Sequence, residues 1–145
     1  MIALIQRVNY AKVVINNELF SEIDKGILAL IGIEKEDTNA TAEKLLDRIL
    51  AYRVFSDDEG KMNLSVSDID GGLMLVSQFT LAAATDKGLR PSFSSAKPPV
   101  EAEAIFNYLL HYAEANYDKL GSGQFAADMK ISLENDGPVT FRLKV

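Results

Sequence analysis

The chain of 145 residues is long enough to bury a hydrophobic core and is expected to form a single domain over residues 1–145. Its composition is that of an ordinary globular protein, with 48% apolar and 25% charged residues, and no apolar run is long enough to predict a membrane span. A net charge of −6 argues against a protein that coats nucleic acid along its length, and the lack of cysteine excludes disulfides and thiolate chemistry.

The first third of the chain predicts strands. Residues 2–8 and 11–15 are rich in Val and Ile, Asn16-Asn17 favours a hairpin turn, and the continuous apolar run 26–33 is typical of a strand buried on both faces. Polar residues interrupt the first segment, which also lacks a basic leader and a small-residue cleavage site. No signal peptide is therefore predicted, and the expected compartment is the cytoplasm.

Two segments have the periodicity of amphipathic helices. The first covers about residues 41–55 and follows three N-cap candidates at 37–39, and the second covers about 98–117 with proline in its first turn. The predicted buried stripe of the first helix consists of Ala42, Leu45, Leu46, Ile49 and Tyr52 or Arg53. Between the helices, the acidic segment 57–60 lacks the ligand spacing of an EF-hand and is interpreted as a solvated turn.

The second half of the chain adds further strands. Residues 73–81, 124–133 and 139–145 have strand-like apolar patterns, 85–93 form a polar loop with two cations, and 121–123 form a flexible glycine joint. The order of these elements predicts an α+β fold, with a mainly antiparallel sheet or barrel-like core and two main helices packed on it.

The stretch Asn135-Asp136-Gly137-Pro138 separates the last two predicted strands. Proline has no N–H and is poorly tolerated inside a sheet. Either the Gly-Pro pair forms a plain hairpin turn, or the turn is itself a working part of the protein.

Groups that could carry out acid–base catalysis are scarce. The single histidine, His111, falls opposite the apolar stripe of its predicted helix, so we expect it in solvent and expect no Ser-His-Asp triad and no histidine-based metal site.

The stretch Ser77-Gln78-Phe79-Thr80 places two hydroxyls and an amide at a predicted strand end. Such hydroxyls usually satisfy only local hydrogen bonds. Without a base they are poor nucleophiles, so a catalytic role here would consist of donating hydrogen bonds to a carbonyl or oxyanion.

The two unusual stretches, SQFTL and NDGPVT, occur together and in this order. With QRV around Arg7, FSDDEGKMN, LVSQFTLAA, GLRPSF and FAADMKISL, they resemble the D-aminoacyl-tRNA deacylase family over the whole chain. Neither short motif is specific alone, but their combination in this order is highly specific.

The resemblance implies a homodimeric hydrolase that cleaves the ester between a D-amino acid and the 3′-terminal adenosine of tRNA, and that also removes glycine from mischarged tRNA. It implies that Ser77 to Thr80 line the pocket. Gly137 and Pro138 of the other subunit, joined by a cis peptide bond, would reach across to exclude L-amino acids, and Arg7 would help to hold them. No cofactor and no metal are implied, and the expected partners are a second copy and the acceptor end of aminoacyl-tRNA, with no membrane and no DNA.

Lys87 and Arg90 in the polar loop are candidates for phosphate contacts with the tRNA, although each is equally expected in an ordinary solvated loop. Two other classes of function stay open. One is a non-enzymatic dimeric binding domain in which both motifs are structural turns, and the other is an esterase for small acylated metabolites.

Overall fold

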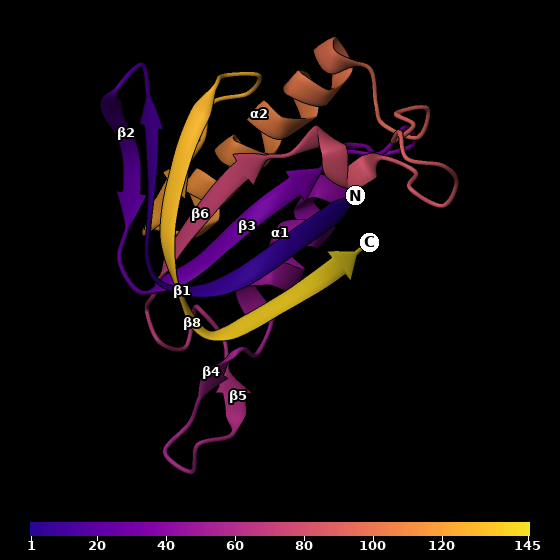
Figure 1. Cartoon of the computed structure of the whole chain (residues 1–145). Coiled ribbons are helices and arrows are strands. Elements are labelled where there is room, and N and C mark those ends of the chain that lie inside the picture. The colour runs from indigo at the N-terminus through magenta and orange to yellow at the C-terminus, as the bar shows by residue number, and fades with distance from the viewer.

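The computed structural model describes the whole chain, residues 1–145. It consists of a strongly curved sheet, two long helices that cover one face of the sheet, and a small hairpin that projects from one end (Figure 1). The elements follow in the order β1 (Ile2–Ile15), β2 (Glu18–Ile23), β3 (Gly26–Gly32), α1 (Asn39–Ala51), β4 (Phe55–Ser56), β5 (Met62–Leu64), β6 (Gly72–Ser77), the 3-10 helix η1 (Phe79–Ala82), α2 (Pro99–Asn116), β7 (Leu120–Ser122) and β8 (Met129–Lys144).

Strand β1 organises the large sheet because it pairs along both of its edges. β8 runs antiparallel along one edge, and β2 and β3 occupy the two halves of the other edge, also antiparallel. β6 and β7 extend the sheet beyond β3 with parallel pairing. The Ser122 N–H donates to Ser21 Oγ (3.1 Å), so β7 approaches β2 and the sheet nearly closes. The predicted α+β fold, with a mainly antiparallel, barrel-like sheet and two helices, is confirmed.

The core has two parts, one on each face of the sheet. Successive side chains of β3 and β6 point to opposite faces and are buried on both, as predicted for the apolar run 26–33. The cluster under the helices includes Ile5, Ile27, Leu45, Ile49, Leu73, Leu75, Phe106 and Leu109. The cluster on the other face consists of Val8, Ala11, Val13, Ile23, Leu28, Met74 and Val76.

Both predicted helices are present, and their predicted stripes face the core. α1 begins after Thr38, whose backbone N–H donates to Thr41 Oγ1 (2.7 Å). The predicted end of this helix at Phe55 is wrong, because the chain becomes extended at Tyr52 and Phe55 enters the β4–β5 hairpin. The acidic segment forms the turn of that hairpin. No helix of the structure is long and apolar enough to cross a membrane.

The predictions for the C-terminal quarter of the chain are wrong at the glycine joint and at the last two strands. The glycine joint overlaps β7, where a Cβ on Gly121 would lie 2.8 Å from both Met74 Cε and Ser21 Oγ, so glycine permits the close approach that brings β7 to β2. The last two predicted strands are one strand, β8, which pairs antiparallel with β1 on both sides of the Gly-Pro pair. Because the chain does not reverse direction there, the Gly-Pro pair is not a hairpin turn.

Candidate functional site

The Ser77–Thr80 stretch lies where β6 ends. Ser77 is the last residue of the strand, and the Gln78 N–H still donates to the Ile31 carbonyl of β3 (2.7 Å). The chain then forms the 3-10 helix η1, so the predicted strand 73–81 is wrong beyond Ser77. A Cβ on Gly32 would lie 2.8 Å from Leu81 Cβ, which shows how closely this helix packs against the end of β3.

The polar groups of this stretch form a local network that contains no acid or base. Gln78 Nε2 donates to Thr80 Oγ1 (2.6 Å), and no histidine or carboxylate is hydrogen-bonded to Ser77 or Thr80. The N–H groups of Phe79 and Thr80 begin the 3-10 helix and have no acceptor inside it. The stretch can therefore supply hydrogen-bond donors to a carbonyl oxygen, but it does not activate either hydroxyl as a nucleophile.

The Gly137-Pro138 pair lies in a bulge of β8. Gln6 and Val8 of β1 pair with Thr140 and Asn135, so the chain from Asp136 to Val139 stands opposite Arg7 alone. The Gly137-Pro138 peptide bond is cis, which confirms that prediction. Gly137 has a φ of 129°, in a region that favours glycine, and a Cβ there would lie 2.9 Å from Val139 Cγ2.

Arg7 connects this bulge to the base of the β4–β5 hairpin. Its Nε donates to the Asp136 carbonyl oxygen (3.0 Å) and lies 3.1 Å from Asp136 Oδ2, and its Nη1 donates to the Val54 carbonyl oxygen (2.6 Å). The Arg7 side chain is only 13% exposed. The guanidinium therefore links two segments that are distant in the sequence.

The two motifs are far apart within one chain. Ser77 pairs with Ile31, which pairs with Ala3, so Ser77 lies level with Ala3, whereas the bulge lies opposite Arg7, four residues further along β1. The path from β6 through β3 and β1 to β8 crosses three strand spacings of about 4.8 Å, and the four residues along β1 add about 3.3 Å each. The two motifs are therefore roughly 20 Å apart. Four cavities of about 400 to 570 Å³ lie elsewhere, and none is lined by either motif.

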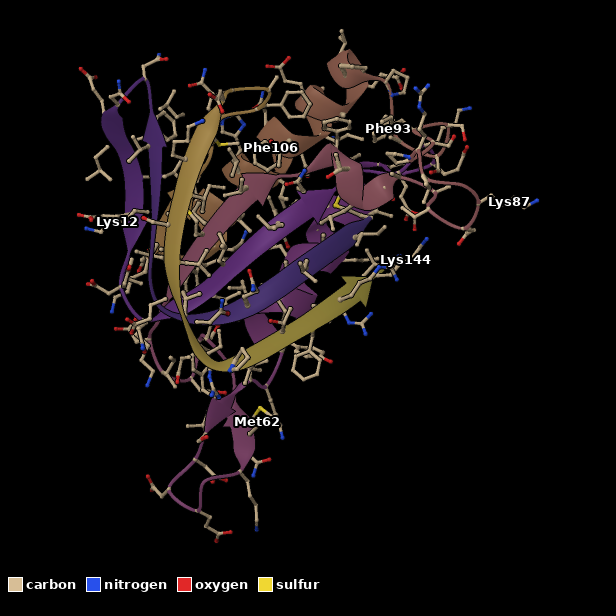
Figure 2. All side chains as sticks on the ribbon, viewed as in Figure 1. Lys12, Met62, Lys87, Phe93, Phe106 and Lys144 are labelled. Carbon is tan, nitrogen blue, oxygen red and sulfur yellow. The ribbon has the colours of Figure 1, made fainter.

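The other singled-out residues lie on the surface. His111 is exposed on α2, as predicted, and Lys87 and Arg90 are exposed in the loop after η1. Figure 2 shows Lys87 at the tip of this loop, on the opposite side of the molecule from Lys12. No group of three or more His, Cys, Asp or Glu side chains is arranged to hold a metal ion.

Two features of the site were not predicted from the sequence. One is the hydrogen bond from Arg7 to the Val54 carbonyl, and the other is the ring of Phe93, which lies beside that of Phe79. The only signal for Phe93 was its place in the GLRPSF stretch.

Comparison with known proteins agrees with the fold and with the family resemblance. The family model of the D-Tyr-tRNA(Tyr) deacylases matches residues 4–144. A D-aminoacyl-tRNA deacylase from Saccharophagus degradans is 56% identical over 143 residues, which cover 99% of each chain. The solved structure of a c-Myc DNA Unwinding Element Binding Protein has a TM-score of 0.95 at 39% identity and covers 100% of this chain and 99% of that one. A probable eukaryotic D-amino acid tRNA deacylase, with a TM-score of 0.81 and 14% identity, is similar in fold.

The fold and these matches define an enzyme of the hydrolase class. The chain belongs to the D-Tyr-tRNA(Tyr) deacylase family. Both the family resemblance and the enzyme class expected from the sequence are confirmed.

Proposed function

We propose that this protein hydrolyses the ester of D-aminoacyl-tRNA, and also of mischarged glycyl-tRNA, at a site built from two copies of the chain. Ser77 to Thr80 of one copy form the floor of the site, and Gly137 and Pro138 of the other copy form its selective wall. The expected setting is the cytoplasm, and the reaction uses no cofactor. Family membership supports the reaction, and the separation of the two motifs within one chain supports the two-copy site.

The observation that carries the two-copy site is the separation of the two motifs within one chain. A pocket for one amino acid is too small to span roughly 20 Å, the distance that follows from the strand spacings. A symmetric pair of chains can place the bulge of each copy over the β6 end of the other and so create two equivalent sites. The long outer edge of β8 and the exposed bulge are available for such a contact.

The chemistry follows from the donors at η1 and from the lack of a base. The N–H groups of Phe79 and Thr80 would polarise the ester carbonyl and stabilise the oxyanion formed when water adds to it. The neighbouring ribose hydroxyl of the substrate would position or activate that water. The bond between the acyl carbon and the ribose oxygen then breaks, the ribose oxygen takes a proton, and the free amino acid leaves as its carboxylate.

Selection against L-amino acids would rest on backbone atoms. Main-chain carbonyls of the Gly137-Pro138 segment would accept hydrogen bonds from the substrate's amino group, and the same wall would leave no space for an L side chain. Glycine, which has no side chain of either hand, would pass. Because Arg7 holds this segment through the Asp136 carbonyl, the wall cannot easily move aside.

A panel of substrates separates this function from its alternatives. We expect hydrolysis of D-aminoacyl-tRNA and glycyl-tRNA, and little hydrolysis of L-aminoacyl-tRNA or of free amino acid esters. Activity only on the free esters would instead indicate an esterase for small metabolites, and activity on none of the substrates would indicate a binding domain.

Mixed dimers test the two-copy site. Phe79→Pro removes one N–H donor at a helix position that tolerates proline, while Phe79→Ala keeps the N–H and serves as its control. Gly137→Val fills the bulge. Phe79→Pro should lose about 10²–10³-fold in kcat. After subunit exchange between Phe79→Pro and Gly137→Val, half of the dimers should be mixed, each with one intact site, so about a quarter of the wild-type activity should return. Mixed dimers that form but stay inactive would contradict the proposal.

The acceptor end of the tRNA would also touch the loop after η1. Lys87 and Arg90 are exposed there and are proposed to contact phosphates. Replacing both by Ala should weaken tRNA binding and lower the slope of log Kd against log salt by about 0.7 per lost contact, the value for a single strand. Lys12→Ala, on the other side of the molecule (Figure 2), should leave the slope unchanged.

A further inference from the structure

The amino group of Met1 is buried and paired with two carboxylates. Its nitrogen lies 2.6 Å from Asp37 Oδ1 and 3.3 Å from Glu34 Oε2, and it also donates to the Val145 carbonyl (3.1 Å). Met1 is 1% exposed and belongs to the core cluster under the helices. An ammonium group has three N–H donors, and each of them has an acceptor inside the protein.

The two ends of the chain close this site together. The N–H of Val145, just beyond β8, donates to the Met1 carbonyl (3.1 Å), so the pairing of β8 with β1 continues to the last residue. Figure 1 shows the two termini side by side at this edge of the sheet. The amino group is therefore held between the final residue of the chain and the turn that follows β3.

Asp37 depends on the Met1 amino group more than Glu34 does. Asp37 is 6% exposed, and its carboxylate has one other hydrogen bond, from the Glu34 N–H (2.6 Å). Glu34 is more exposed, and its carboxylate also pairs with Lys144 Nζ (2.7 Å). Loss of the positive charge on Met1 would leave the Asp37 carboxylate buried without a cation, which is strongly destabilising.

We propose that the Met1 amino group is a site whose modification state controls folding, and that the stable protein requires it to be free of any acyl group. Chains made on bacterial ribosomes start with N-formylmethionine. A formyl group turns the ammonium into a neutral amide with a single N–H, so Asp37 loses its cation and two of the three donors disappear.

Removal of the formyl group would then have to precede stable folding. In that hydrolysis water adds to the formyl carbon, the C–N bond breaks, formate leaves, and the nitrogen takes up the proton that makes it an ammonium. The inference goes beyond the proposed function and does not depend on the deacylase reaction, because it concerns the stability of the chain itself.

The expected cost comes from charge rather than from lack of space. A cavity of about 460 Å³ lies against Met1 and is also lined by Thr41 and Lys144, so a formyl group has room beside the nitrogen. A variant that removes the charge of Asp37 should therefore tolerate the formyl group, although its shape is the same.

The test compares formylated and free forms of the full chain. Cell-free translation with bacterial ribosomes gives the free form, an inhibitor of peptide deformylase gives the formylated form, and intact mass identifies each. Breaking a buried ion pair by removing one partner, at an unfolding entropy of about 2.1 cal/mol/K per residue, corresponds to a fall in Tm of about 10 to 15 °C. We expect this fall for the formylated wild type.

Two variants separate lost charge from other effects. Asp37→Asn lacks the carboxylate that needs the cation, so formylation should lower its Tm much less than that of the wild type. Glu36→Gln removes an exposed carboxylate of the same turn and should keep the full fall.

Equal melting temperatures of the two wild-type forms would overturn the proposal. An equally large fall in Asp37→Asn would also overturn it, because the formyl group would then act through something other than the lost cation. If the formylated wild type does not fold at all, folding of formylated Asp37→Asn supports the proposal and its failure to fold overturns it.

Discussion

Replacing Arg7 by Ala should both destabilise the protein and free the Gly137-Pro138 bulge. The guanidinium donates to the carbonyls of Asp136 and Val54 at 3.0 and 2.6 Å. Hydrogen bonds to a charged group contribute about 1.5–3 kcal/mol each, and the ion pair with the partly exposed Asp136 carboxylate adds at most about 1 kcal/mol. Taking the lower value for each of the two hydrogen bonds, we expect a loss of about 3 kcal/mol.

This loss can be measured as a change in melting temperature and in kinetics. An unfolding entropy of about 2.1 cal/mol/K per residue gives about 0.3 kcal/mol/K for the chain, so the Tm should fall by about 10 °C. A displacement of about 1 Å at the site can cost about 10²-fold, so kcat/KM on D-aminoacyl-tRNA should fall by that order. The ratio of D-aminoacyl-tRNA to L-aminoacyl-tRNA hydrolysis should fall as well, because a mobile Gly137-Pro138 segment would exclude L-aminoacyl-tRNA less well.

Two further variants control this experiment. Arg7→Lys keeps one charge but cannot bridge two carbonyls with a planar group, so it should be intermediate. Arg48→Ala removes an exposed arginine that donates only to the Lys144 carbonyl (2.9 Å), and both measurements should change little. A fall in Tm with unchanged D/L discrimination would show that Arg7 has only a structural role. An unchanged Tm would refute the energetic reasoning itself.

Three other predictions follow from the contacts described. Thr80→Ala should keep measurable deacylation, with a loss of no more than about 10²–10³-fold, because its hydroxyl has no base; a trapped acyl-Thr80 intermediate would contradict this. His111→Ala should leave the rate unchanged because the side chain is exposed on α2, and a tenfold loss with the fold intact would reveal a missed contact. Burial opposes ionisation of Glu34, but hydrogen bonds from Lys144 and the amino terminus lower its pKa below the ordinary 4.5. The ionised form therefore stabilises the fold above pH 4.5, and this stabilisation is lost as the pH falls through the lowered pKa. Urea midpoints should show Glu34→Gln less stable than wild type at pH 7, with a gap that narrows below pH 4.5.

The spacing of apolar residues predicted the helices and the buried strands, because residues that face the core recur at regular intervals along the sequence. It failed where an element is ended by a group far away in the sequence. The apolar pattern from Leu73 continues to Leu81, yet the strand ends at Ser77, because the last ladder bond goes from Gln78 to Ile31 and the chain then packs against Gly32. Nothing local to 73–81 encodes those partners.

The candidate site was predictable in its residue types but not in its contacts. The scarcity of bases indicated donors rather than nucleophiles at Ser77 to Thr80, and the resemblance supplied Arg7. The bond from Arg7 to Val54 spans 47 residues, and the Phe79–Phe93 pair depends on closure of the intervening loop. Such contacts follow from the tertiary fold, so no spacing within the sequence could have predicted them.

The position of the bulge within β8 also determines how rigid it can be. A hairpin loop is held only at its base, where its two strands meet each other. This bulge is held by β1 on both sides, at Asn135 and at Thr140, and in its middle by Arg7. Three points of attachment over so short a segment fix the direction in which its carbonyls point. A wall that must reject one enantiomer needs this property, because a segment free to shift by an ångström would admit both.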